Sequence, residues 1–189
     1  MKKIILFIIV FSINNYVTNA DYSSHIMWGK NKKTVIVYDK QLDILINRWY
    51  SLTRILDILA LKTNECNDYE WKCIWYHQAT KTPMDYGHFQ INVIHKEIVE
   101  KTKENWDNPK LHFKIQLTYV NKLLDSYEKW YCSTKSIVWK YWYWSNQLRV
   151  ECIGRLYNWS SFKKSYWQWT YLKRENLKKY VKDYINNKK

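Results

Sequence analysis

The chain lacks several features that mark common protein classes. It contains no Cys-x-x-Cys and no His-Glu-x-x-His, and its five histidines show no ligand spacing, which argues against a zinc site. After residue 20 it has no apolar run long enough to span a bilayer. It has no internal repeat and no low-complexity linker, so we expect a single folded domain. Glycine is scarce, with three in 189 residues, so a glycine inside a short motif needs a structural reason.

The first twenty residues have the pattern of a signal peptide. Lys2 and Lys3 precede an almost wholly apolar run over residues 4–13, which is too short to span a bilayer. Two asparagines cut that run short, which disfavours the alternative of an uncleaved anchor. We therefore expect a signal peptide over 1–20 and an exported protein of the periplasm or cell envelope, with no stable membrane span after cleavage.

The chain is strongly basic, with 31 Lys and Arg against 17 Asp and Glu and a formal charge of +14. Such a surface favours anionic partners, namely nucleic acid, acidic lipids or an anionic wall polymer. Export makes nucleic acid the weakest of these, and we expect no nucleic-acid partner. A codon bias toward Lys, Asn, Ile and Tyr explains the same charge without any partner.

The four cysteines all follow the signal region, and an even number in an exported protein indicates disulfides. Four cysteines allow three connectivities, and the sequence does not choose among them. The local pairing joins Cys66 to Cys73 and Cys132 to Cys152.

The periodicity predicts a mainly helical domain. Residues 21–33 have the composition of a loose arm, and 34–38 are β-prone. A helix should then run from Leu42 to Glu65 with an apolar face. The residues that repeat on this face are Leu42, Leu45, Trp49, Leu52, Leu56 and Leu59.

The second half of the chain continues this pattern after a predicted loop over 66–84. A short helix is expected over 93–103. Asp107-Asn108-Pro109 is a helix-start signal, and the next helix has one apolar face formed by Leu117, Val120, Leu124, Tyr127 and Tyr131. A helical spacing follows at Val150, Ile153 and Tyr157. The expected organisation is a signal peptide at 1–20, an arm at 21–40, the main folded domain at 41–165 and a basic amphipathic helix at 166–189.

An aromatic-rich stretch and a basic tail have two interpretations each. The rings at 139–144 either stack on sugars or pack in the core, and their density favours the core. The lysines of the C-terminal helix either contact an anionic wall or membrane or form a solvated face, and we favour the solvated face.

Glu65 differs from the other acids because it ends an apolar helix just before an irregular segment. Burial against apolar side chains raises the pKa of a carboxyl group, which then acts as a general acid near neutral pH. Taken alone, Glu65 is more simply a surface glutamate at a helix end. The motif Asp85-Tyr86-Gly87-His88-Phe89-Gln90-Ile91-Asn92 downstream changes that balance.

Three motifs together carry a family resemblance. TNEC at 63–66, DYGHFQIN at 85–92 and GRLYNWS at 154–160 occur in the order seen in lysozyme-like lytic transglycosylases. The closest similarity is to the small exported kind associated with secretion and conjugation machinery, and it covers about 40–160. The resemblance implies a single, mainly α lysozyme-like domain that acts on peptidoglycan glycan strands without a metal or other cofactor, with secretion-system components as further partners.

Matched residue by residue, the resemblance assigns Glu65 as the catalytic acid and base. The substrate-binding positions that it implies are Gly87, Phe89, Gln90, Tyr157 and Asn158. A glutamine amide suits N-acetyl groups and hydroxyls because it both donates and accepts, and the family tyrosine faces the catalytic glutamate.

The chain departs from the family pattern at four positions. Cys66 replaces a serine and is expected to be half of a disulfide. His88 replaces a leucine and is expected to be an exposed turn residue. Trp159 and Ser160 replace residues that are often small or glycine, which either narrows the cleft or extends a sugar-stacking surface.

The family mechanism uses one carboxyl group. Glu65 would protonate the oxygen between N-acetylmuramic acid and N-acetylglucosamine and then accept the proton of the muramic 6-hydroxyl, which leaves a 1,6-anhydro end. Hydrolysis by a lysozyme uses two carboxyl groups as a rule. Asp68 and Glu70 are candidates for the second but are more simply solvated loop charges, and Asp85 is expected to shape the turn.

Three alternatives stay open on the sequence. The first alternative is a hydrolytic lysozyme. The second is a non-catalytic peptidoglycan-binding assembly factor of a secretion apparatus, which the departures at Cys66 and His88 allow. A cationic membrane-active protein is a third idea, which rests on charge and aromatic content alone.

Overall fold

The computed structural model describes residues 24–28, 34–66, 73–132, 146–157 and 164–188. These parts of the chain are mainly helical, with two small antiparallel sheets. The predicted mainly α class is therefore confirmed. The predicted signal peptide, Asn158 and the aromatic stretch 139–144 lie outside the described residues.

The N-terminal part forms a β-hairpin. Strand β1 (Ser24–Trp28) pairs antiparallel with β2 (Thr34–Tyr38). The β-prone segment at 34–38 is therefore a strand. The prediction of a loose arm over 21–33 is wrong at Ser24–Trp28, because these residues form a strand as well. Pairing with β2 supplies hydrogen-bond partners to the β1 backbone, and a tertiary effect of this kind overrides local composition.

The predicted helix from Leu42 to Glu65 is two helices, α1 (Asp39–Asn47) and α2 (Leu52–Glu65). The break occurs at Trp49, whose φ of 58° is left-handed. Ser51 then caps α2, because its side chain accepts a hydrogen bond from the Arg54 amide at 3.2 Å. The predicted end of this helix at Glu65 is confirmed.

The prediction of a loop over 66–84 is wrong in part. Two strands lie in or overlap this range, and they belong to a three-stranded sheet. This sheet has the order β3 (Ile74–Tyr76), β4 (Pro83–Tyr86), β5 (Ile91–Asn92), and both pairings are antiparallel. Ile74, Tyr86 and Ile91 are direct partners across the sheet and face the core. The strands are too short for a clear period of two, so the sequence hides them.

The helices after the sheet follow the predicted pattern. Helix α3 spans Lys96–Glu104, and α4 spans Pro109–Trp130. Asn108 caps α4 by accepting from the Leu111 amide at 3.0 Å, and Pro109 occupies the first turn, which confirms the predicted helix start. Helix α6 (Asn146–Tyr157) buries Val150 and Ile153.

The last helix, α7 (Lys164–Asn187), begins earlier than the predicted amphipathic tail. Its Leu177 and Val181 are fully buried in the main core, so one face of α7 is part of the folded unit. The opposite face is solvated and basic, and it carries Lys178, Lys179 and Lys182.

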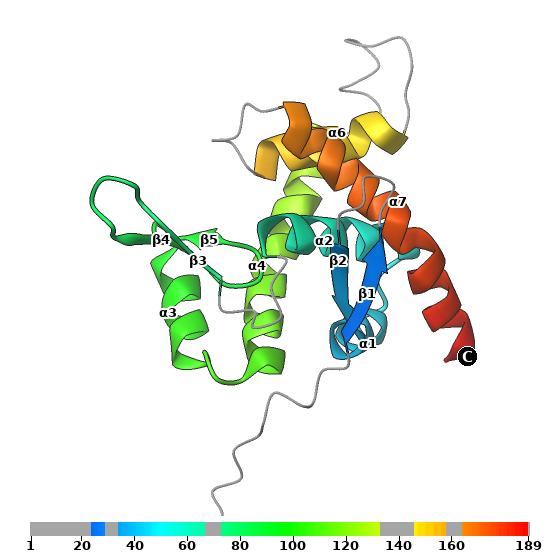
Figure 1. The fold of residues 1–189 in the computed structure, drawn as a ribbon, viewed down its shortest axis with the longest axis horizontal. Coiled ribbons are helices and arrows are strands. Elements are labelled where there is room, and N and C mark those ends of the chain that lie inside the picture. Colours follow the sequence, from blue (N-terminus) through cyan, green and yellow to red (C-terminus); the bar gives the residue numbers. More distant parts are fainter. Residues whose placement is uncertain (1–23, 29–33, 67–72, 133–145, 158–163, 189) are drawn as a thin grey trace, which may run out of the picture.

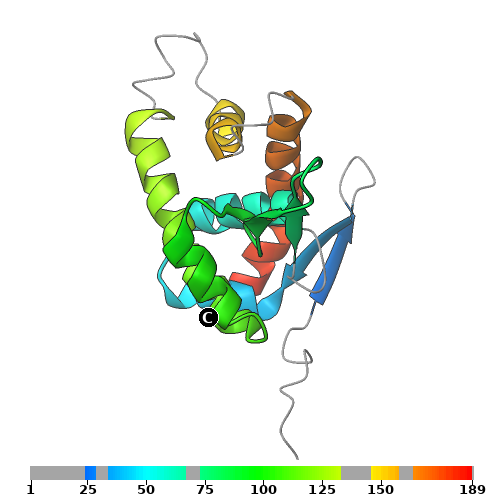
Figure 2. The ribbon, with the colours of Figure 1, turned by 90° about the vertical axis from the view of Figure 1, so that its left-hand side faces the viewer.

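Helix α2 lies at the centre of the described structure, with α4 on one side and α7 on the other (Figure 1). The view turned by 90° shows the same order around α2 (Figure 2). The three-stranded sheet and α3 lie beside α4, away from α7. The end of α2 therefore lies between α4 and α7, and the sheet lies on the α4 side.

A buried ion network ties α2 to three other helices. Asp57 of α2 is 2% exposed and accepts from Arg149 of α6 and Arg174 of α7, each at 2.8 Å. Arg149 also bonds to Glu128 of α4 at 2.7 Å. Because removing one member strands a buried charge, the network strongly disfavours separation of these helices.

The two disulfides follow the local pairing, Cys66–Cys73 and Cys132–Cys152. Disulfides of this kind indicate an oxidising, extracytoplasmic compartment. None of the helices in the described part of the chain combines the length and the apolar character needed to cross a bilayer.

Candidate functional site

Glu65 is the last residue of α2 and is partly buried. Its neighbour Cys66 ends the helix, with its amide bonded to the Lys62 carbonyl at 2.8 Å. Lys173 of α7 donates to the carbonyl of Thr63 in the last turn. A carboxyl group at this position faces the negative end of the helix dipole. The end of α2 is therefore fixed on both sides of Glu65, by the bond from Lys173 to Thr63 before it and by the disulfide at Cys66 after it.

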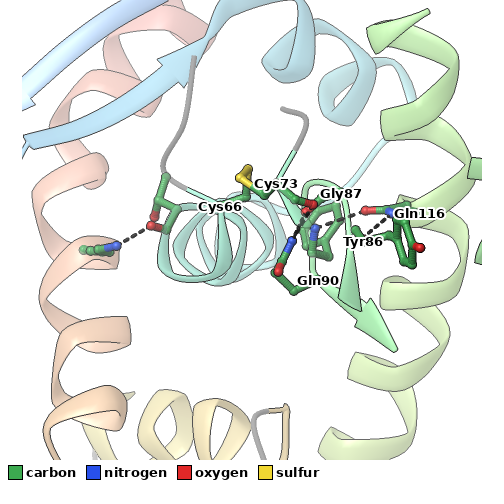
Figure 3. Close-up of a disulfide and its surroundings, with 9 residues drawn as sticks. Cys66, Cys73, Tyr86, Gly87, Gln90 and Gln116 are labelled. Carbon is green, nitrogen blue, oxygen red and sulfur yellow. Dashed lines mark hydrogen bonds between the residues drawn. A yellow bond between two sulfur atoms is a disulfide. The ribbon is translucent and has the colours of Figure 1, made fainter. Parts of the chain in front are cut away.

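The Cys66–Cys73 disulfide joins the end of α2 to the residue before β3, which bonds to the turn between β4 and β5. The carbonyl of Cys73 accepts from the Gly87 amide at 2.7 Å and from Gln90 Nε2 at 2.9 Å. Gln90 Nε2 also donates to the Gly87 carbonyl at 2.9 Å. Figure 3 shows this turn lying against the disulfide at the end of α2. The first and second sequence motifs are therefore linked through Cys73.

Two residues of the turn have left-handed backbone, Gly87 with φ 78° and Gln90 with φ 48°. Glycine adopts this conformation without strain, whereas glutamine does not. Strained backbone of this kind persists only where the surroundings enforce it, and it clusters at functional sites. The amide of Gln90 holds the turn through Nε2, and its Oε1 has no partner among the described residues. Its predicted contact with substrate stays a prediction.

Gln116 of α4 anchors the same turn from the other side, and no pattern in the sequence singles it out. Its Oε1 accepts from the Phe89 amide at 3.1 Å, and its Nε2 donates to the Tyr86 carbonyl at 2.8 Å. The Gln116 side chain is fully buried and reaches the turn from α4 (Figure 3). A Cβ atom on Gly87 would lie 2.4 Å from Gln116 Nε2. The glycine is therefore required by packing as well as by its φ.

Tyr157 brings the third motif to the second. Its hydroxyl donates to the Phe89 carbonyl at 2.6 Å. The Phe89 ring itself is fully buried and stacks on Phe113, with centroids 5.7 Å apart. The backbone of Phe89 is buried as well, with its amide bonded to Gln116 and its carbonyl to Tyr157, so the structure leaves no part of Phe89 open to a ligand. Gly87 and Gln90 bond to Cys73, the disulfide partner of the residue after Glu65, and Tyr157 bonds to Phe89 between them in sequence. Asn158 lies outside the described residues.

His88 is fully buried, so the expectation of an exposed turn residue is wrong. Its ring lies 4.9 Å from that of His112 on α4, which is also fully buried. Neither ring makes a hydrogen bond of good geometry among the described residues. Burial is the main cause that lowers the pKa of His88 well below its usual range, with His112 and Lys62 adding to it and the backbone of Pro109 opposing it. Burial also lowers the pKa of His112 to about 4.

Asp85 lies on β4 instead of shaping the turn, which corrects the sequence expectation. Its Oδ1 accepts from Asn92 Nδ2 at 2.7 Å, across the pairing of β4 with β5. Partial burial raises the pKa of the Asp85 carboxyl, and the Asn92 bond opposes this shift. Asp85 is therefore a half-buried carboxyl group in the sheet that follows Glu65. Asp68 and Glu70 lie outside the described residues.

Within the described ranges, no group of three or more His, Cys, Asp or Glu side chains is arranged to hold a metal ion. Searches with protein-family models, curated proteins and solved structures found no match to this chain.

Proposed function

We propose that the protein is a peptidoglycan lytic transglycosylase with Glu65 as its catalytic residue. One observation supports this most: the end of α2 at Glu65 is fixed to the Gly87–Gln90 turn through Cys66–Cys73, and Tyr157 is bonded to that turn at Phe89. Three motifs separated in sequence are thus linked, which supports the proposal that the glutamate, the turn and the tyrosine serve one reaction.

In the proposed reaction, the protonated Glu65 carboxyl donates its proton to the glycosidic oxygen between N-acetylmuramic acid and N-acetylglucosamine. The C1–O bond breaks, and the N-acetylglucosamine end leaves as an alcohol. The Glu65 carboxylate then accepts the proton of the muramic 6-hydroxyl, whose oxygen bonds to C1. The product is a 1,6-anhydro end, no water is consumed, and Glu65 regains its starting protonation state.

Glu65 is partly buried as the last residue of α2, and partial burial is the environment in which a carboxyl group commonly serves as a general acid, which supports the acid role. The rigid surroundings support it as well. General acid catalysis needs a carboxyl group held within hydrogen-bond reach of one oxygen, and the disulfide at the adjacent residue restricts the movement of the helix end.

A second candidate is hydrolysis of the same bond, and Asp85 is the observation that favours it. Asp85 is a half-buried carboxyl group on the sheet tethered to the Glu65 helix end. With two carboxyl groups, one donates the proton and the other activates water or stabilises positive charge at C1. The products would then have reducing ends.

The proposed setting is the periplasm or cell envelope, with local wall remodelling during assembly of a secretion apparatus as the role. The two disulfides support an oxidising compartment. A non-catalytic wall-binding assembly factor is the remaining alternative. It predicts binding to wall sacculi with no release of fragments.

Product analysis tests the proposed activity. Purified protein is incubated with peptidoglycan sacculi, and the soluble fragments are identified by mass spectrometry. We expect disaccharide peptides with 1,6-anhydro ends. Reducing ends would replace the proposal with hydrolysis, and bound protein without released fragments would replace it with the assembly factor.

A further inference from the structure

The outer face of the three-stranded sheet carries a row of three side chains from three strands. Trp75 of β3 is the direct partner of Asp85 on β4, and Asp85 is the direct partner of Asn92 on β5. Side chains alternate between the two faces of a strand. Because the adjacent row of Ile74, Tyr86 and Ile91 faces the core, the row of Trp75, Asp85 and Asn92 faces away from it. We call these three residues the outer row.

Trp75 supplies an accessible aromatic plane. Its side chain belongs to the exposed large hydrophobic residues, at 48% exposure. Its indole has no hydrogen-bond or ring partner among the residues that the structure describes. Tryptophan has a large apolar face and one N–H donor at its edge, so it suits a ligand that is apolar on one side and polar at its rim.

Asp85 supplies a fixed hydrogen-bond acceptor beside that plane. Asn92 orients it through the bond from Nδ2 to Asp85 Oδ1 at 2.7 Å, and Asn92 Oδ1 is itself fixed by the Ile94 amide at 3.1 Å. Asp85 Oδ2 has no partner within the described ranges. A half-buried acceptor with an open position binds a donor without first reorganising its neighbours.

The outer row is close to Glu65 along the covalent chain. Cys66 follows Glu65 directly, its Cα lies 5.8 Å from that of Cys73, and Trp75 follows two residues later. This path keeps the Cα atoms of Glu65 and Trp75 within about 17 Å of each other. A single glycan strand is long enough to contact both.

We propose that the outer row is a saccharide subsite, in which Trp75 stacks on the apolar C–H face of a sugar ring and Asp85 Oδ2 accepts from one of its hydroxyl groups. A pyranose ring combines an apolar face with hydroxyl donors at its rim, which matches this pairing. A cationic ligand would also suit an aromatic ring beside a carboxylate, but the net charge of +14 repels cations. That the sugar belongs to peptidoglycan rests on the proposed function.

Binding to a non-cleaved ligand tests the subsite separately from catalysis. The full chain carrying Glu65→Gln is titrated with a soluble hexamer of N-acetylglucosamine by isothermal calorimetry. Adding Trp75→Leu is expected to weaken binding about tenfold, and adding Trp75→Tyr should retain it within about threefold. The matched control is Trp130→Leu on α4, since Trp130 is also exposed, at 63%, but lies outside the sheet. It should leave the affinity unchanged.

The outcomes separate this inference from the proposed function. An affinity that Trp75→Leu leaves unchanged overturns the subsite, even if the wild-type protein cleaves sacculi. Equal losses for Trp75→Leu and Trp130→Leu, or no binding by the parent protein, overturn it too. A loss confined to Trp75→Leu upholds the subsite, even if the wild-type protein releases no anhydro products and the proposed reaction fails.

Discussion

The hydroxyl of Tyr157 donates a 2.6 Å hydrogen bond to the backbone carbonyl of Phe89, which is 68 residues away in sequence. This bond holds the end of α6 against the Gly87–Gln90 turn. Phe89 is doubly fixed, because its amide donates to Gln116 of α4. The turn is therefore clamped between α6 and α4, and it lies beside the disulfide of Cys66, the residue after Glu65.

Tyr157→Phe removes only the hydroxyl group and leaves the Phe89 carbonyl without this donor. We expect the free energy of unfolding to fall by about 1 kcal/mol, the usual worth of such a bond. Urea unfolding measures the loss. Tyr127→Phe is the control, because its hydroxyl donates to the Leu156 carbonyl at a longer 3.3 Å and should cost less. A larger loss in the control would contradict the clamp.

Gly87→Ala should destabilise the protein strongly, by about 2 kcal/mol or more, because the new Cβ meets buried Gln116 and the positive φ opposes alanine. The matched control is Gly154→Ala within α6, where the nearest atom, Thr170 Oγ1, is 3.0 Å away. Alanine favours helix there, so the change should stay within about 1 kcal/mol of zero. Thermal unfolding compares the two, and similar midpoints would show that the turn is looser than described.

The buried histidines predict a loss of stability in mild acid. His88 and His112 are neutral in the folded protein because burial lowers the pKa of each. In the unfolded chain they bind protons below their ordinary pKa of about 6.5. Stability is therefore fully present above that pH and falls as the pH drops, by up to about 1.4 kcal/mol per pH unit for each histidine.

His88→Leu tests this dependence. Urea unfolding between pH 7 and pH 5 should give a smaller slope than the wild type, because one proton-binding group is lost from the unfolded chain. The control is Phe113→Leu, which alters the packing beside the His88 ring without removing a histidine and should retain the wild-type slope. An unchanged slope in His88→Leu would show that His88 is not held neutral by the fold.

Trp49→Gly should stabilise the protein by about 0.5–1 kcal/mol. Trp49 is 94% exposed and has φ 58°, so glycine relieves backbone strain while little packing is lost. Trp49→Ala is the control, because it retains the strain and should leave stability near the wild-type value. The shift in the urea midpoint measures both variants, and a glycine variant no more stable than the alanine variant would refute the explanation.

Local sequence signals, namely capping residues and apolar periodicity, predict much of the helical fold. The Asn108-Pro109 start of α4 and the end of α2 at Glu65 depend on capping and periodicity, and the structure has both. The break at Trp49 is not predictable in this way because the apolar spacing continues through it, and no glycine marks the left-handed residue. Strands β3 to β5 escape prediction because each has two to four residues.

The contacts of the candidate site are only partly predictable. Motif order indicates that Glu65, Gln90 and Tyr157 belong together, and glycine scarcity marks Gly87. The burial of His88 and the role of Gln116 depend on α4 packing over the turn, a contact between residues about 30 apart that no local pattern encodes. The proximity of Trp75 to Asp85 likewise requires the strand register.

Cleavage of peptidoglycan by Glu65→Gln is the most direct test of the central claim. The amide is close in shape to the acid but cannot donate and recover a proton, so fragment release from sacculi should fall by about 10²–10⁴-fold. Circular dichroism and the urea midpoint should match the wild type. Glu97→Gln, at an exposed position of α3, is the control, with release expected within about twofold of wild type. Wild-type rates of anhydro-product release by a folded Glu65→Gln protein would contradict the account.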